Sequence, residues 1–215
     1  MIGVILPSRG LIFSRTADEI LQNLKDVPHK FYFAHKRPIP ECFNEPLERA
    51  LKDDVTHIWI VEDDMVLPKG TLTQLLEMDK AVVTADYPVN EKGRGSVFAL
   101  KGQTIYCGTG CLLIKREVFD ELKRPIFRTD VRWRMKNYGK QIKISSHYSE
   151  DEGYGLHDIT FCMSLYERSI PIHVIKTKLA QRKLVSLGKA GSNNGAHVIE
   201  IWKEIKKDQI GKAHV

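Results

Sequence analysis

The chain has few cysteines, and none of its four belongs to a CxxC pair. Cys42, Cys107, Cys111 and Cys162 lie among apolar neighbours, which favours reduced core thiols over zinc ligands or disulfides. Reduced thiols are typical of a reducing compartment, and we therefore expect a cytoplasmic protein.

Long apolar segments are also absent. No run approaches the roughly 20 apolar residues that a membrane-spanning helix needs. The start of the chain lacks the basic flank, the apolar core and the small-residue cleavage site of a signal peptide, so we expect none. Internal repeats, low-complexity tracts and a linker rich in Pro, Gly or Ser are missing as well. With 215 residues, the simplest prediction is one domain over residues 1–215.

The net formal charge of +6 is small, but its distribution along the chain is uneven. Residues 1–100 contain 12 basic and 15 acidic groups, whereas residues 101–215 contain 21 and 12. The positive second half suits an anionic partner. A solvated basic face has the same composition, so charge alone does not establish nucleic-acid binding.

Apolar runs alternate with helical patterns along the first 85 residues. We predict strands at 2–6, 30–34, 57–61 and 81–85, and helices at 16–25, at 43–52 and from Pro68. Thr16 is expected to be the N-cap of the first helix, because an acid follows three residues later. This alternation predicts an α/β fold with an open, mainly parallel sheet flanked by helices.

The alternation weakens after residue 87. We predict short strands at 97–100, 103–106 and 111–114, which suit an antiparallel edge, then helices at 115–122 and 157–167, a strand at 172–175 and a C-terminal amphipathic helix at 197–207. No element is predicted for the basic, aromatic-containing segment 123–150. A glycine-rich loop is predicted at 187–195.

Three consecutive carboxylates follow a predicted buried strand and precede a proline. Glu62, Asp63 and Asp64 raise one another's pKa unless a cation neutralises them, and hard oxygen ligands favour Mg²⁺ or Mn²⁺. Ligands of open α/β sheets bind beyond the carboxyl ends of the strands. The alternative is an exposed acidic turn that serves helix capping.

The acidic segment resembles the DXD region of GT-A glycosyltransferases, in an EDD-like form. Further segments follow in the family's order: 4–10 resembles the first strand and its nucleotide-contacting turn, 106–119 the Gly-containing segment near the donor sugar, and 154–162 the acceptor-side helix. The resemblance spans about residues 2–180. It implies a GT-A-like, Rossmann-related fold with a nucleotide-sugar-binding half, 1–100, and an acceptor-binding half, 101–215.

The resemblance also implies residue roles. Asp64 would coordinate a Mn²⁺ or Mg²⁺ ion bridging the donor diphosphate, while Glu62 and Asp63 would contact ribose, base or metal-bound water. The other implied donor-binding residues are Pro7, Ser8, Arg9, Asn44, Gly108, Thr109 and Gly110. Asp158 would be the general base of an inverting transfer, although an Asp at a helix start also caps the helix.

Two positions depart from the family's pattern. His157 stands where the family usually has Glu, on the acceptor side. The stretch 177–183 lacks the metal-binding His that many members supply, and His197 is the candidate substitute. His173 lies inside a predicted apolar strand and is expected to be a core residue.

Together these observations predict a metal-dependent hexosyl- or pentosyltransferase. It would move a sugar from a nucleotide-diphosphate sugar, most simply a UDP-sugar, to a hydroxyl of a glycan or an anionic acceptor. The alternatives are a nucleotidyltransferase or phosphatase, for which a P-loop and a second acidic cluster are missing, a basic nucleic-acid-binding module around 123–143, and a glycosyltransferase acting on modified nucleic acid.

Overall fold

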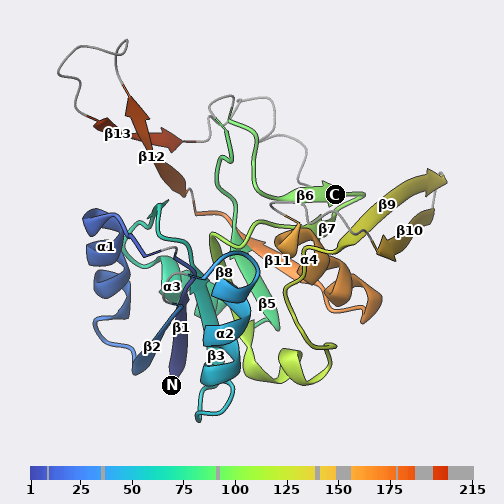
Figure 1. Ribbon diagram of the computed structural model, residues 1–215, viewed down its shortest axis with the longest axis horizontal. Helices are drawn as coiled ribbons and strands as arrows, with labels where there is room; N and C mark the ends of the chain where they lie inside the picture. The colour runs from blue at the N-terminus through green and yellow to red at the C-terminus, as the bar shows by residue number, and fades with distance from the viewer. Residues whose placement is uncertain are drawn as a thin grey trace.

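The computed structural model describes residues 1–8, 10–34, 37–90, 93–138, 141–148, 156–177, 179–186 and 196–202. Its centre is an eight-stranded sheet (Figure 1). The strand order is β2 (His29–Phe33), β1 (Ile2–Leu6), β3 (His57–Val61), β8 (Cys111–Lys115), β5 (Val82–Ala85), β11 (Ile172–Ile175), β7 (Gln103–Tyr106) and β6 (Phe98–Leu100). The predicted α/β fold is confirmed.

Strand direction makes this sheet mixed but mainly parallel. β2, β1, β3, β5, β11 and β6 point the same way, whereas β8 and β7 run against them. The pairing of β7 with β6 gives the expected antiparallel edge. The sequence did not indicate that β8 lies inside the sheet, between β3 and β5.

Helices cover both faces of the sheet. Alternate side chains of a strand point to opposite faces, so Ile58 and Ile60 pack with α2 (Glu41–Ala50) and α4 (His157–Glu167). Trp59 and Val61 pack on the other face with α1 (Ser14–Leu24) and α3 (Thr71–Glu77). The resulting three layers give the central strands two buried faces, which explains their continuous apolar runs.

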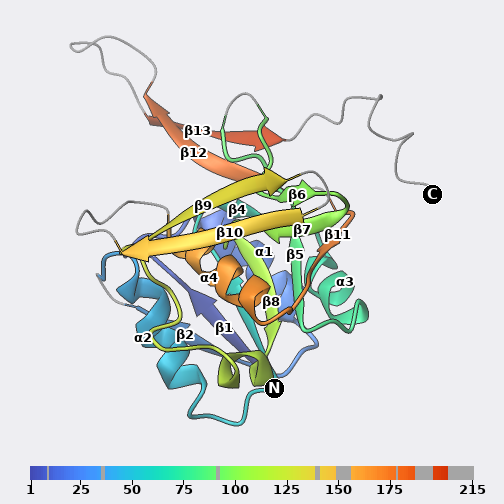
Figure 2. The ribbon, with the colours of Figure 1, turned by 90° about the vertical axis from the view of Figure 1, so that its right-hand side faces the viewer.

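Two smaller sheets extend from this body. β9 (Val131–Tyr138) and β10 (Gln141–Tyr148) form an antiparallel pair beside α4 (Figure 2). β4 (Met65–Val66), β12 (Ala180–Ser186) and β13 (Ala196–Trp202) form a three-stranded sheet in the order β13-β12-β4. In Figure 1, β12 and β13 extend away from the main sheet.

Several local predictions are corrected by the structure. Thr16 is not the N-cap of α1: the helix begins at Ser14, and the buried Thr16 hydroxyl donates to the main-chain oxygen of Met65 at 2.8 Å. α3 begins at Thr71 rather than Pro68, after Gly70, whose φ of 82° lies in the left-handed region. The predicted helix at 115–122 is a shorter 3₁₀ turn, η1 (Arg116–Asp120).

The predicted C-terminal helix is also wrong over its first residues. Residues 196–202 form β13, where Val198, Ile199 and Ile201 are β-branched and suit a paired strand better than a helix. Residues 203–207 of that prediction and the predicted loop 187–195 lie outside the described residues.

The four cysteines are buried and free, as predicted. Cys107 and Cys162 lie closest, with their Sγ atoms 3.9 Å apart. No helix within the described ranges is long and apolar enough to cross a membrane.

Candidate functional site

The carboxyl ends of the parallel strands open into a cavity of about 510 Å³. Pro7 follows β1, Glu62 follows β3 and Tyr87 follows β5. Because β8 runs antiparallel between β3 and β5, its beginning lies at the same edge and places Gly108 and Thr109 in the cavity. The lining residues are Pro7, Ile39, Cys42, Phe43, Glu62, Asp63, Asp64, Tyr87, Val89, Arg94, Gly95, Ser96, Tyr106, Gly108, Thr109, His157, Asp158 and Gln181.

The acidic turn, residues 62–64, is held through its main chain from three directions. The amide of Glu62 donates to the carbonyl of Gly110 at 3.1 Å. The carbonyl of Asp63 accepts from the amide of Phe13, and that of Asp64 accepts from the amide of Arg182 at 2.6 Å. The backbone is therefore fixed by other segments while the three side chains line the cavity.

Thr109 links the acidic turn to α4. Its hydroxyl donates to Glu62 Oε1 at 2.7 Å and lies 3.3 Å from His157 Nε2. Since one hydroxyl has one proton, Nε2 is the donor in the second contact, and His157 is the neutral tautomer protonated at Nε2. The imidazole packs against the ring of Phe43 with centroids 4.5 Å apart.

Burial sets the protonation of these groups. Desolvation, reinforced by Asp64, Asp158 and Asp63, raises the pKa of Glu62 to about 7, against a smaller lowering by the Thr109 hydrogen bond. Desolvation also raises the pKa of Asp158 to about 6. The same effect lowers the pKa of His157 to about 4, so His157 is neutral near pH 7.

Two glycines make room for the ring of Tyr87 in this edge of the sheet. A Cβ at Gly108 would overlap the Tyr87 hydroxyl oxygen, and one at Gly110 would lie 2.6 Å from Tyr87 Cζ. The amide of Gly110 donates to that hydroxyl at 2.8 Å. The glycines thus leave space for the Tyr87 ring, which lines the cavity.

The cavity brings together most of the residues singled out from the sequence. Those that line it are Pro7, Glu62, Asp63, Asp64, Gly108, Thr109 and Asp158. Ser8 lies beside it, in a separate apolar cavity of about 210 Å³ with Phe33 and Leu11. Gly110 packs against Tyr87 and Met65. Arg9 lies outside the described residues.

Asn44 is not among the residues that line the cavity, and its side chain has another partner. Its amide donates to the carbonyl of Phe127 at 2.9 Å and accepts from the amide of the same residue at 3.0 Å. Both hydrogen-bonding functions of the side chain are used, so Asn44 fastens α2 to the segment that leads into β9.

His197 lies on β13, with its backbone opposite Val185 of β12. Asp64 contacts β12 at Arg182. The three residues from 182 to 185 span about 10 Å of an extended strand. The strand register therefore places the backbone of His197 about that distance along β12 from the residue that contacts Asp64. This placement does not favour a metal site shared by His197 and Asp64.

Several lining residues were missed in the sequence, and the reasons differ. Tyr87 follows the strand predicted at 81–85 and was given no role, and Tyr106 entered only as the first residue of the segment that resembles the donor-sugar region. Arg94 lies in a turn whose place at the cavity depends on tertiary structure. Gln181 belongs to β12, which was not predicted because its polar residues do not alternate with apolar ones.

The carboxylates of the acidic turn suit a divalent cation that takes only some of its ligands from the protein. Within the part of the chain that the structure describes, no group of three or more His, Cys, Asp or Glu side chains is placed to hold a metal ion. Mg²⁺-type ions usually take one or two carboxylates and leave the other positions to water and substrate phosphates. Asp63 and Asp64, both lining the cavity, can supply such ligands.

Comparisons with known proteins add information on the fold. No family model matches this chain, and no curated protein matches it by sequence. Among solved structures, the one titled "Crystal Structure of A197 from STIV" matches with a TM-score of 0.57 and 16% identity, over 84% of each chain. Similarity at this identity concerns the fold alone. The chain therefore shares with that protein an α/β fold, here a mixed, mainly parallel sheet flanked by helices.

Proposed function

We propose that this chain is a metal-dependent glycosyltransferase of the GT-A type, organised as a single catalytic domain. The observation that carries the proposal is the convergence of the acidic turn, Thr109 and Asp158 on one cavity at the carboxyl edge of the sheet. Open α/β sheets bind their ligands at this edge. The cavity size is within the usual range for small-molecule sites.

The donor half of the proposed reaction uses the acidic turn. Asp64 would hold a Mn²⁺ or Mg²⁺ ion, and Glu62 and Asp63 would contact the ribose, the base or metal-bound water. Bound there, the ion would act as a Lewis acid that stabilises the charge on the departing nucleoside diphosphate. Arg94, which also lines the cavity, adds a positive charge that suits a diphosphate.

The acceptor half uses α4. Asp158 lies in the first turn of the helix, where its Oδ1 accepts from the amide of Ile159 at 2.7 Å. With a pKa of about 6 it is mostly ionised at neutral pH and is a stronger base than an ordinary Asp. Asp158 accepts the proton of the acceptor hydroxyl while that oxygen bonds to the anomeric carbon and the bond to the diphosphate breaks, with inversion.

A glycosyltransferase that acts on modified nucleic acid is the second candidate, and the β9–β10 ribbon favours it. Arg132, Arg134 and Lys136 occupy alternate positions of β9, and Lys143 of β10 is paired with Lys136. Alternate positions of a strand belong to one face, so these four positions share a face. Basic residues at these positions would suit a phosphate backbone.

A thermal-shift screen of UDP-, GDP-, CMP- and dTDP-sugars, each with Mn²⁺ and with EDTA, tests the proposal. A donor that binds the folded state raises the unfolding temperature by mass action. We expect a shift with one nucleotide class, a UDP-sugar first, only when Mn²⁺ is present. Absence of any shift in folded protein would contradict the proposal.

Two variants then separate the roles within the site. Asp64→Ala should lose the Mn²⁺-dependent shift, whereas Asp158→Asn should keep it and lose transfer by about 10²–10⁴-fold, the usual contribution of a general base. Asp120→Asn, which changes an exposed carboxylate of η1, is the control. Wild-type turnover by Asp158→Asn would remove that residue from the reaction.

A further inference from the structure

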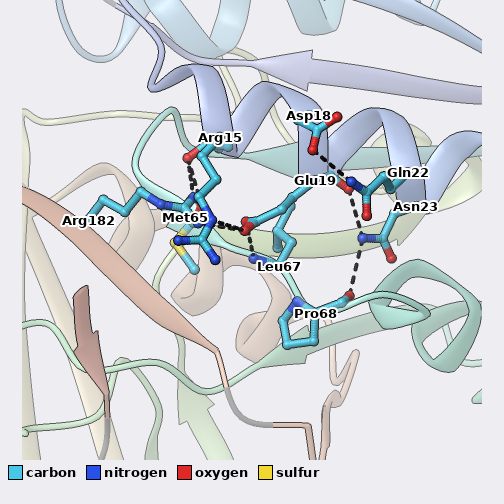
Figure 3. Close-up of polar contacts among 10 residues, drawn as sticks. Arg15, Asp18, Glu19, Gln22, Asn23, Met65, Leu67, Pro68 and Arg182 are labelled. Atoms are coloured by element: carbon cyan, nitrogen blue, oxygen red, sulfur yellow. Dashed lines mark hydrogen bonds and ion pairs between the residues drawn. The ribbon is translucent and has the colours of Figure 1, made fainter. Parts of the chain in front are cut away.

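Arg182 is a buried cation outside the cavity. Its side chain is 2% exposed and forms an ion pair of 2.6 Å with Glu19 of α1, which is 14% exposed. Its Nη1 donates to the Met65 carbonyl at 2.6 Å and to the Thr16 hydroxyl at 2.7 Å. Figure 3 shows this guanidinium between α1 and the chain that follows the acidic turn.

The Arg182–Glu19 pair holds the main chain directly after the acidic turn. Arg182 binds two successive carbonyls, that of Asp64 through its own amide and that of Met65 through its guanidinium. Glu19 Oε2 accepts from the amide of Leu67 at 2.9 Å. The ion pair thus holds main-chain groups at residues 65 and 67 (Figure 3), and the main-chain amide of Arg182 holds the carbonyl of residue 64.

Holding these groups restrains the main chain from which the Asp64 side chain projects. The Asp64 carbonyl lies in the peptide plane between residues 64 and 65, and the guanidinium holds the next carbonyl, that of Met65, so the side chain of Arg182 keeps this segment in place beside its own amide contact. The same contacts hold β12 against β4, where Gln181 is paired with Met65 and its side chain lines the cavity. Both walls of this corner of the cavity therefore depend on Arg182.

We propose that Arg182, through its buried pair with Glu19, is the positioning residue for the metal-binding carboxylate of Asp64. This inference rests on the proposed function and deepens it. Arg182 does not line the cavity, so its effect passes through the main chain rather than through contact with donor or ion. A planar guanidinium makes these contacts simultaneously, which an ammonium group cannot reproduce.

The test compares Mn²⁺ binding, with UDP present, in four proteins, by the loss of the electron paramagnetic resonance signal of free Mn²⁺. Arg182→Met combined with Glu19→Gln removes both charges together, since removal of one would leave the other buried and unpaired. Arg116→Met with Asp120→Asn makes the same chemical change in an exposed pair of η1. Val118→Ala, in the buried side of η1, lowers stability away from the site.

We expect the Arg182/Glu19 double variant to bind Mn²⁺ about 10–100-fold more weakly, the usual effect of removing a group that orients a metal ligand. Both controls should bind as the wild type does, even if Val118→Ala is equally destabilised. If the double variant fails to fold, Arg182→Lys is tested in its place, because it keeps the positive charge and loses the set of contacts that the guanidinium makes. This variant should also bind Mn²⁺ more weakly than the wild type.

The possible failures are distinguishable. Wild-type affinity in the folded variant would overturn the positioning role and leave the proposed function intact. A weakening matched by Val118→Ala would also overturn it, because the effect would then follow stability. A wild-type protein that is folded but does not bind Mn²⁺ would overturn the proposed function, and this inference with it.

Discussion

Glu62 is expected to destabilise the ligand-free protein at neutral and alkaline pH. Its folded-state pKa of about 7 lies above the ordinary value of 4.5 because burial and three neighbouring carboxylates disfavour the ionised form. Between these two values the folded protein retains a proton that the unfolded chain has released. Stability therefore falls as the pH rises through this window, and the loss is complete above about pH 7.

The size of the effect follows from the shift. With pKa values of about 7 in the folded state and 4.5 in the unfolded state, proton linkage lowers the free energy of unfolding by roughly 2.5 kcal/mol between pH 5 and pH 8. Glu62→Gln keeps the shape of the side chain and an oxygen that can accept the hydroxyl proton of Thr109, but it cannot ionise. The variant should therefore gain about that much stability relative to the wild type as the pH rises from 5 to 8.

Urea unfolding at both pH values, with EDTA present, measures the difference. Glu77→Gln is the control, because it removes a carboxylate from the exposed side of α3. It should show no comparable change between the two pH values. The reasoning is refuted if Glu62→Gln has the same stability relative to the wild type at pH 5 and at pH 8, or loses stability as the pH rises.

Two further substitutions test the packing around the site. Gly110→Ala would place a methyl group 2.6 Å from Tyr87 Cζ and 2.7 Å from Met65 Sδ. We expect the free energy of unfolding, measured in urea, to fall by about 1–3 kcal/mol. An unchanged stability would contradict the close approach. Asn44→Ala should lower the free energy of unfolding by about 1–3 kcal/mol, because it leaves the main-chain groups of Phe127 without their partners. The donor affinity, measured by thermal shift, should stay the same. Weaker donor binding at unchanged stability would show that Asn44 contacts the nucleotide.

The sequence predicted the elements whose apolar period is regular. The strands at 2–6 and 57–61 and the helix at 157–167 have the expected bounds, because each buries an uninterrupted face or run. β12 was missed since its buried Gln181 and Arg182 are paired with residues far away in the sequence. Local hydropathy does not contain that information.

The same distinction applies to the site. The acidic turn was predicted from residues adjacent in sequence, and the structure places it at the carboxyl edge. Asn44 was named as a donor contact only through the family resemblance, whereas the structure pairs its side chain with the main chain of Phe127, 83 residues away. To predict that Tyr87 and Gln181 line the cavity, one needs the order of the strands in the sheets, which the periodicity of the sequence does not specify.

The contact between Arg182 and Thr16 has a consequence for the order in which the chain folds. The two residues are 166 positions apart, so a large loop must close before this contact forms. During synthesis β1, α1 and β3 are made before residue 182, so they are present in the growing chain while this contact cannot yet form. The segment after the acidic turn thus acquires its final anchoring late in synthesis, and fragments that end before β12 lack it.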